Sequence, residues 1–261
     1  MRVLILGGGG MLGHKLWQVC RDRFETWVTV RSNYNEYARY ELFELKHMLG
    51  GVEALNFDTI VQAFAVVHPD VVINCIGIIK QLPMAQDPIA GLTVNALFPH
   101  RLVNLCQVGG IRLIHISSDC VFSGRKGSYT EADVPDAEDL YGRAKLLGEV
   151  GGAQSLTVRT SIIGRELQTT SGLVEWFLSQ RGGKVRGYTH AIYSGFTTLA
   201  LALVIADVIE RHSDLVGLYQ ISSKPITKYD LLCLLRDAFA VPVEIERGCR
   251  ALEGLGGGCP E

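Results

Sequence analysis

Short apolar runs alternate with amphipathic segments along the first two thirds of the chain. The runs at 2–6, 25–30, 69–77, 111–118 and 155–163 have the length and composition of β-strands. Because they carry few internal polar positions, we expect strands that are buried on both faces of a parallel sheet. Their alternation with helical segments predicts an α/β fold of the Rossmann type, a doubly wound parallel sheet with a smaller C-terminal lobe.

Segments with helical spacing separate and follow these strands. Apolar residues recur at three- and four-residue intervals in the stretches 14–24, 58–67, 90–108, 141–150, 173–179, 198–210 and 228–239. After Gly164 the pattern loosens, with one further strand at 215–222, and we expect pieces of this half to return to the first. The sequence thus predicts two domains, residues 1–163 and residues 164–261. The tail from Arg247 has no periodicity, and we expect it to be frayed.

A glycine-rich turn follows the first strand directly. Gly7, Gly10 and Gly13 have a G-x-x-G-x-x-G spacing, and Gly8 and Gly9 make a G-x-G-x-x-G register readable as well. Glycine permits a positive φ and removes the Cβ that would keep a phosphate away from the backbone. A helix that begins here would point free N–H groups at a pyrophosphate, so the turn predicts a dinucleotide site. A purely structural turn is the competing interpretation.

The end of the second strand should carry the group that reads the ribose of the cofactor. An acidic residue there would bind the 2′-hydroxyl of NAD, whereas an arginine would pair with the 2′-phosphate of NADP. The chain has Arg31 and Ser32 at this place and no acid before Glu36. We therefore expect NADP(H) to be preferred, with NAD(H) as the alternative. Arg31 as a solvated loop charge is the competing interpretation.

Tyr141 and Lys145 lie four residues apart in YGRAK, on one face of a predicted helix. A phenol has a pKa of about 10 in water, and an ammonium about 4 Å away would lower it by roughly three units. The pair thus predicts a phenol that donates a proton near neutral pH. The strand before it ends in Ser117 and Ser118, followed by Asp119, and a hydroxyl there could hold the substrate oxygen.

Two further features lie beside this pair. Residues 119–140 form a turn-rich segment that is too long for an ordinary connection, so we expect a functional loop. We interpret its acidic part, 131–139, as a solvated flap near the active site rather than as a metal site. Arg159 is interpreted as a member of a structural ion pair or as a strand-end charge.

Composition narrows the range of partners. The chain has 25 Lys and Arg against 27 Asp and Glu, and its net charge of −2 argues against a general nucleic-acid binder. No apolar stretch reaches the roughly 20 uncharged residues of a membrane span, and the apolar opening is too short for a signal peptide. The seven cysteines contain no C-x-x-C pair, and the histidines show no ligand spacing. We expect a cytoplasmic protein without a metal site.

Five segments carry a family resemblance. In this order, GGGGMLG, VINCIG, HISSDCVFSG, YGRAKLLGE and VRTSIIG resemble the extended short-chain dehydrogenase/reductase superfamily. Within it the chain is most similar to the dTDP-4-dehydrorhamnose reductase branch, from Met1 to about Val243. The resemblance implies a sugar-nucleotide lobe at 164–261 and an NADP(H)-dependent reduction of a nucleotide-linked 4-keto-6-deoxy sugar, with a tyrosine as the proton donor.

The resemblance also implies roles for individual residues. Ser118, Tyr141 and Lys145 match the catalytic set of the family. Together with the glycine turn and Arg31, the expected cofactor-binding residues are Gly7, Gly10, Met11, Leu12, Gly13, Arg31, Glu53, Ala54, Gly77, Ile78, Ile79, Tyr141 and Lys145. The expected substrate-binding residues are Ser118, Asp119, Lys80 and Ile162.

The chain departs from the branch at some of these positions. Cys120 and Ser123 replace the Tyr and the second Asp of S-T-D-Y-V-F-D-G, and Ile162 stands where a Trp is common. A 4,6-dehydratase would need a second acid after Asp119, where Cys120 stands. A nucleotide-sugar 4-epimerase with tightly bound NAD needs the same catalytic set, and a non-catalytic NADP-binding regulatory subunit is the alternative from another class. The expected partner is the nucleotide sugar, and a homodimer is the candidate assembly.

Overall fold

A seven-stranded parallel sheet forms the centre of the computed structural model, which describes residues 1–249. The strand order is β11-β6-β5-β4-β1-β2-β3, and each neighbouring pair is parallel. The strands are β1 (Arg2–Leu6), β2 (Glu25–Thr29), β3 (Met48–Leu49), β4 (Val71–Asn74), β5 (Arg112–Ile116), β6 (Ser155–Thr160) and β11 (Gly217–Ile221). The order reverses between β1 and β4, and ligands of such sheets bind in the crevice at this reversal. The predicted doubly wound sheet is confirmed.

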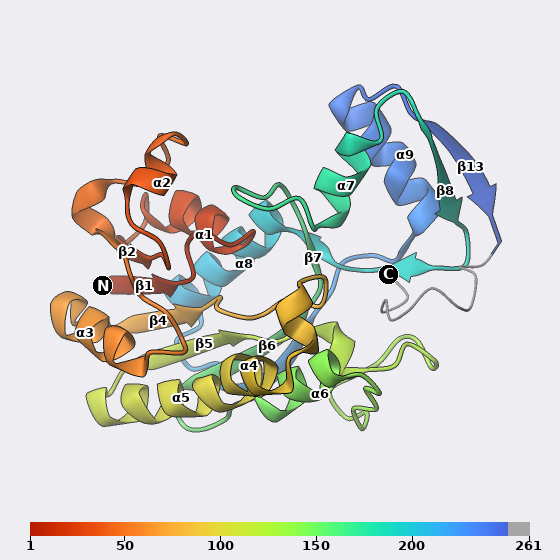
Figure 1. Ribbon diagram of the computed structural model, residues 1–261. Coiled ribbons are helices and arrows are strands. Elements are labelled where there is room, and N and C mark those ends of the chain that lie inside the picture. The colour runs from red at the N-terminus through yellow and green to blue at the C-terminus, as the bar shows by residue number, and fades with distance from the viewer. Residues whose placement is uncertain (250–261) are drawn as a thin grey trace.

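Helices cover both faces of this sheet (Figure 1). Alternate residues of β1 face opposite layers: Val3 and Ile5 belong to the core with α1 and α8, whereas Leu4 and Leu6 belong to the core with α3 and α5. These helices are α1 (Gly13–Cys20), α3 (Phe57–Val67), α5 (Phe98–Gly109) and α8 (Thr198–Arg211). Because both faces are covered, the central strands need no polar positions, which explains their continuous apolar runs.

A second, smaller core lies in the lobe at the upper right of Figure 1. It is enclosed by α7 (Leu173–Ser179), α9 (Lys228–Phe239) and two parallel strands, β8 (Lys184–Tyr188) and β13 (Glu244–Gly248). Its buried residues are Val174, Phe177, Val185, Leu232, Leu235, Val241 and Val243. The C-terminal half therefore contributes both to this lobe and, through α8 and β11, to the central layers.

Short elements connect these layers. Two-stranded sheets join β7 (Ile162–Ile163) to β10 (Phe196–Thr197) and β9 (Ile192–Tyr193) to β12 (Ile226–Thr227). The remaining helical elements are α2 (Asn35–Ala38), η1 (Leu45–His47), η2 (Pro83–Gln86), α4 (Pro88–Leu92), η3 (Thr93–Leu97), η4 (Asp119–Val121) and α6 (Leu140–Leu147). Within residues 1–249, none of the helices is both long and apolar enough to cross a membrane.

Three predicted helices differ from the structure, and the first of them, 14–24, already ends at Cys20. The predicted helix 90–108 is interrupted by a π-helical turn, η3, between α4 and α5. The predicted helix 141–150 ends at Leu147. The next residue, Gly148, packs directly on η3, because a Cβ added there would lie 1.9 Å from the carbonyl oxygen of Asn95. The close approach of α6 to η3 is thus set by a glycine.

Some strands also differ from the prediction. The predicted strand 155–163 breaks at Ser161, where the chain leaves the central sheet and β7 pairs with β10 instead. Strands β8 and β13, KVRGY and EIERG, were not predicted, because charged residues and a glycine interrupt their short apolar pattern. Arg247 and Gly248 belong to β13, so the expected fraying is wrong there, and the tail from 250 lies outside the described residues.

Candidate active site

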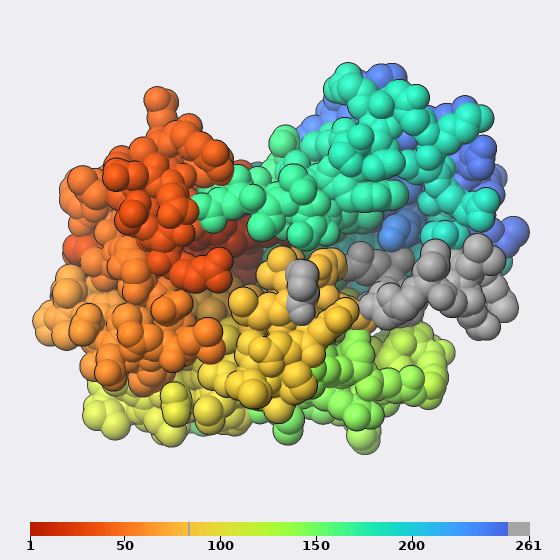
Figure 2. Space-filling model, viewed as in Figure 1, coloured from red at the N-terminus to blue at the C-terminus, as the bar shows by residue number. Residues whose placement is uncertain are grey.

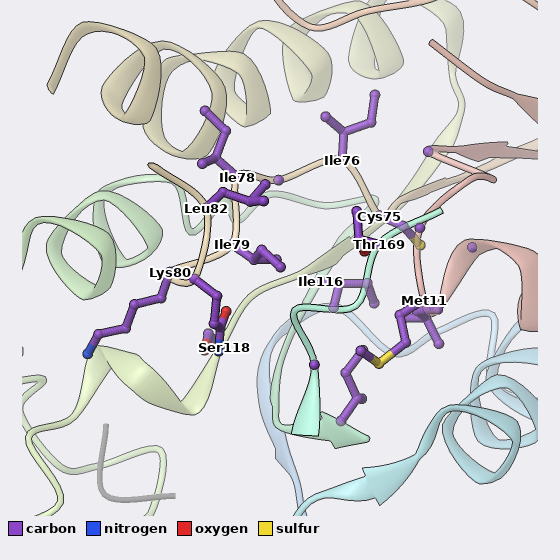
Figure 3. Close-up of a pocket in the computed structure, with 18 of the residues that line it drawn as sticks. Met11, Cys75, Ile76, Ile78, Ile79, Lys80, Leu82, Ile116, Ser118 and Thr169 are labelled. Carbon is purple, nitrogen blue, oxygen red and sulfur yellow. The ribbon is translucent and has the colours of Figure 1, made fainter. Parts of the chain in front are cut away.

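A pocket of about 1130 Å³ lies where the strand order reverses, at the carboxyl ends of β1, β4 and β5. Its wall contains every residue that the sequence assigned to a cofactor or a substrate. Figure 2 shows the green segment after β7 reaching across the hollow toward the orange N-terminal part. In Figure 3, Met11 lies on one side of the pocket, and Ile78, Ile79 and Lys80 lie across from it. The structure thus brings the predicted residues together, and their individual roles stay predictions.

The glycine turn after β1 builds one end of the pocket. Gly7 has a φ of +88°, which favours glycine, and its carbonyl oxygen accepts a hydrogen bond from the backbone N–H of Gly10 at 3.0 Å. A Cβ on Gly13 would lie 2.2 Å from the Gly7 oxygen, so the helix can begin here only with a glycine. Among residues 1–249, no group accepts a hydrogen bond from the backbone N–H of Met11 or Leu12. These free donors at the start of α1 fit the pyrophosphate of a dinucleotide.

The two extra glycines of the turn are required by packing. A Cβ on Gly8 would lie 1.9 Å from Cγ2 of Val28 in β2, and a Cβ on Gly9 would lie 2.3 Å from the hydroxyl oxygen of Tyr37. Tyr37 is buried and lines the pocket. The turn therefore lies tightly between β2 and an aromatic side chain that the sequence had not assigned to the site.

The residues expected to read the adenosine end lie along the same pocket. Arg31 follows β2, is exposed, and forms no salt bridge with any carboxylate among residues 1–249. Its guanidinium is thus available to an anionic group such as a 2′-phosphate. Glu53 and Ala54 also line the pocket, and the backbone N–H of Glu53 donates to the Oγ1 of Thr59 at 3.1 Å.

Two asparagine side chains hold the loop after β4. The Oδ1 of Asn74 accepts from the backbone N–H of Ile76 at 3.1 Å. Asn95 in η3 accepts from the N–H of Ile78 and donates to the carbonyl of Ile78, both at 2.9 Å. The segment with Gly77, Ile78 and Ile79 therefore has a fixed backbone where it lines the pocket. The π-helical turn supplies this clamp, which is a frequent use of such turns at functional sites.

Ser118 extends from the end of β5 into the pocket and is 7% exposed. Its Oγ accepts from the backbone N–H of Cys120 at 3.1 Å and donates to the Oδ1 of Asp119 at 3.4 Å. The second bond is long, so the hydroxyl proton is free to turn toward a substrate oxygen.

Tyr141 and Lys145 come from α6, which packs against η4 beside Ser118. Tyr141 is half-buried and lines the pocket. Lys145 is 6% exposed, and its Nζ donates to the carbonyl of Ile116 at 2.8 Å. Burial lowers the pKa of Lys145 to about 8, although the nearby charge of Glu149 opposes this shift. The ammonium is therefore the main form at neutral pH.

Asp139 links this helix to the loop after β4. Its Oδ1 accepts from the backbone N–H of Gly142 at 2.8 Å and caps α6, and its Oδ2 lies 2.5 Å from the Nζ of Lys80. Burial raises the pKa of the Asp139 carboxyl, but the bonds from Lys80 and Gly142 outweigh this effect and lower it. The ammonium of Lys80 is thus paired with the carboxylate of Asp139. The predicted contact of Lys80 with a sugar or phosphate stays a prediction. Ile162 in β7 lines the pocket half-buried.

The structure adds a strap that the sequence did not indicate, residues 165–172. The hydroxyl of Tyr37 donates to the Oε1 of Gln168 at 3.2 Å, and the hydroxyl of Tyr40 donates to the carbonyl of Leu167. A Cβ on Gly172 would lie 2.9 Å from Cε of Met11, so the strap also touches the glycine turn. These contacts join irregular segments far apart in the sequence, which is why periodicity gave no sign of them.

No group of three or more metal-ligating side chains gathers anywhere in residues 1–249. Arg159 forms the expected structural ion pair, with Glu149, below the strand end that carries Ser118.

Comparisons with known proteins agree with this architecture. The family model of the RmlD substrate binding domain matches residues 1–246. Methionine adenosyltransferase 2 subunit beta from Danio rerio is 29% identical over 254 residues, which cover 92% of this chain and 75% of that protein. The crystal structure of a hypothetical dTDP-4-dehydrorhamnose reductase from Sulfolobus tokodaii has a TM-score of 0.81 at 24% identity, with 100% of this chain and 90% of that chain covered. The dTDP-4-dehydrorhamnose reductase from Bacillus anthracis, solved in complex with NADP, has a TM-score of 0.75 at 20% identity, with coverage of 95% and 84%.

Proposed function

We propose, since the chain belongs to the family of the RmlD substrate binding domain, that it is an NADP(H)-dependent reductase of a nucleotide-linked 4-keto-6-deoxy sugar. One observation carries the proposal: Ser118, Tyr141 and Lys145 line the same pocket as the glycine turn and Arg31. The pocket volume of about 1130 Å³ exceeds the roughly 300–1,000 Å³ of common small-ligand sites, so a dinucleotide and a second ligand fit together.

The residues divide the binding of the two ligands between them. Free N–H groups at the start of α1 bind the pyrophosphate, and Arg31 binds the 2′-phosphate. Glu53 and Ala54 would hold the adenine, and the clamped loop with Gly77, Ile78 and Ile79 would hold the nicotinamide. Asp119, Lys80 and Ile162 lie on the side of the sugar nucleotide. The NADP complex of the Bacillus anthracis reductase supports this choice of cofactor.

Each catalytic side chain has one task. Bound NADPH supplies the hydride for the carbonyl carbon of the sugar. Ser118 donates a hydrogen bond to the carbonyl oxygen and stabilises the negative charge that develops there. Tyr141 gives its phenolic proton to that oxygen, and Lys145, held by the Ile116 carbonyl, supplies the positive charge that makes the phenol a better acid.

Stopped-flow absorbance of NADPH tests the proposal directly. The purified chain is mixed with NADPH and with 4-keto-6-deoxy sugars linked to dTDP, UDP or GDP. We expect loss of NADPH absorbance with at least one of them. Tyr141→Phe should abolish this loss and leave the Kd of NADPH within about threefold, because the phenol proton is needed for reduction and not for binding. Wild-type turnover in that variant would contradict the assignment of Tyr141.

A regulatory subunit that binds NADP without turnover is the second candidate. The likeness to methionine adenosyltransferase 2 subunit beta over 92% of this chain favours it. The presence of both Tyr141 and Lys145 favours the enzyme instead. Tight NADPH binding with no turnover of any keto-sugar nucleotide would select the regulatory function, and NAD retained through purification would select a 4-epimerase.

We also propose that the chain forms a homodimer. Ile89 and Leu92 on α4 and Leu147 on α6 are exposed, and the two helices are in contact. Neighbouring exposed apolar side chains are typical of an interface. Light scattering after size exclusion should give twice the chain mass, and a monomer at 50 μM would contradict the proposal.

A further inference from the structure

A buried ion pair lies beside the strand end that carries Ser118. Glu149 and Arg159 are 9% and 6% exposed at their side chains. The Nε of Arg159 donates to Oε1 of Glu149 at 2.7 Å, and an Nη2 bond of 2.8 Å reaches Oε2. Such a two-bond pair has a fixed orientation. Its net contribution to stability is small, because the cost of removing both charges from water offsets their attraction.

The same carboxylate also holds the strand end that carries Ser118. The hydroxyl of Ser117 donates to the Oε1 of Glu149 at 2.9 Å. The backbone N–H of Ser117 donates to the carbonyl of Val158 in β6 at 2.8 Å. Ser117 is thus fixed through both its side chain and its backbone. Ser118, the next residue, leaves this anchored point toward the pocket.

Glu149 also follows Lys145 by one helical turn. Its backbone N–H donates to the carbonyl of Leu146 at 3.1 Å, so the turn continues past the end of α6. The attraction between the Glu149 carboxylate and the buried ammonium favours the protonated amine. Arg159, in contrast, meets the carboxylate from β6 and also lies over the ring of Phe122 at 5.1 Å.

Several other titratable groups surround the amine of Lys145. They are Cys75 after β4, His115 on β5 and Cys120 in η4. Burial holds the pKa of His115 well below its usual value and raises the pKa of the Cys75 thiol, so both are uncharged at neutral pH. Glu149, in contrast to these neighbours, brings a negative charge to the amine.

We propose that Glu149 is a positioning residue for the reduction: one buried carboxylate, one helical turn after Lys145, anchors the backbone before Ser118 and sets a negative charge beside the amine of Lys145. The proposal rests on the proposed function for its catalytic meaning. The proposal assigns different tasks to the two residues of the ion pair. Glu149 acts on the reaction, whereas Arg159 acts on Glu149. A merely structural ion pair would make the two residues equivalent.

Glu149→Gln tests the charge, because the amide keeps the shape and an acceptor for Ser117. We expect the alkaline limb of the pH profile of kcat/KM to move down by about one unit, which is a tenfold change in the protonation ratio. Arg159→Lys is the matched control: it lowers Tm but leaves the limb in place, because Glu149 stays charged. Glu149→Asp keeps a carboxylate, so its alkaline limb should lie at the wild-type position.

The double variant Glu149→Gln with Arg159→Gln covers the case in which the single variant does not fold, because the buried guanidinium of Arg159 is then not left without its carboxylate. Titration of the ¹³Cε signal of Lys145, assigned with Lys145→Arg, needs no substrate and should show the same downward shift. If turnover fails but this shift is found, the enzyme assignment is wrong and the electrostatic role of Glu149 stands. A native fold with an unmoved ¹³Cε titration, or equal limbs for Glu149→Gln and Arg159→Lys, would overturn the proposal.

Discussion

The hydroxyl of Tyr37 and the side-chain oxygen of Gln168 are hydrogen-bonded at 3.2 Å, although 131 positions separate them in the chain. This bond and the one from Tyr40 to the carbonyl of Leu167 tie the strap to the α2 region, across the glycine turn. Gln168 and Gly172 of the strap line the same pocket as the glycine turn. We therefore expect that a dinucleotide bound at the turn would be released only when these contacts open.

Removing the Tyr37 hydroxyl should speed the release of the cofactor. Tyr37→Phe loses one hydrogen bond worth about 1 kcal/mol, so we expect the NADPH dissociation rate to rise roughly fivefold. The rate is measured by stopped-flow displacement of NADPH fluorescence. Tyr219→Phe is the control, because Tyr219 is exposed on β11 and does not line the pocket. Equal dissociation rates for wild type and Tyr37→Phe would show that the contact between Tyr37 and the strap does not control the release of NADPH.

Arg31 should determine the preference between the two nicotinamide cofactors. Loss of charge-assisted bonds to a 2′-phosphate costs about 1.5–3 kcal/mol, so Arg31→Ala should weaken NADPH binding about 10- to 150-fold and leave NADH binding nearly unchanged. Isothermal titration with both cofactors measures this. Arg21→Ala, at an exposed arginine outside the pocket, should change neither Kd. An unaltered ratio of the two Kd values in Arg31→Ala would show that Arg31 is a solvated charge.

The buried ammonium of Lys145 should reduce stability below about pH 8. Its pKa falls from 10.5 to about 8 on folding, so the unfolded chain binds the proton more tightly. The penalty is complete below the folded pKa and disappears as the pH rises toward 10.5. Lys145→Met should therefore be more stable than wild type at pH 7, by about 2 kcal/mol after loss of the bond to Ile116.

Urea unfolding at pH 7 and pH 10 measures this difference, which should shrink at the higher pH. Lys46→Met, at a lysine that is 73% exposed, is the control and should show no such trend. If Lys145→Met exceeded wild type in unfolding free energy by the same amount at both pH values, the result would contradict a lowered pKa of Lys145.

The contact of Gly148 with η3 should make this glycine hard to replace. Gly148→Ala places a Cβ 1.9 Å from the backbone oxygen of Asn95, and the forced shift should cost about 1–3 kcal/mol of unfolding free energy. Gly151→Ala, three residues on, meets no atom within 4 Å and should change the value by less than about 0.5 kcal/mol. Chemical denaturation of both variants gives the comparison. Equal stabilities would mean that η3 moves aside freely.

Local patterns were enough to predict six of the seven central strands and part of the crevice, whereas β3, with only two residues, was missed. The glycine turn, Ser118 and the Tyr141–Lys145 pair are set by spacing within a few residues of a strand end or a helix, so they can be read from the sequence. The roles of Glu53, Ala54 and Ile162 came from the family resemblance and stay predictions. Their place in the pocket is a finding of the structure.

Contacts between distant segments could not be read in this way. Tyr37 meets Gln168, and Glu149 meets Ser117 and Arg159, only because the sheet brings separate connections together. The π-helical turn at Asn95 likewise depends on the clamp to Ile78, whereas the local spacing there is that of an ordinary helix.

One of the two edge strands of the central sheet, β11, and one of its covering helices, α8, are contributed by the C-terminal half. β11 pairs with β6 along its whole length, and α8 packs on α1. A chain cut after residue 163 would leave β6 as an open edge and the inner side of α1 bare to water. The N-terminal half is therefore not a separable module, and exchanging the C-terminal lobe between relatives would require grafting around β11 and α8 rather than at a single junction.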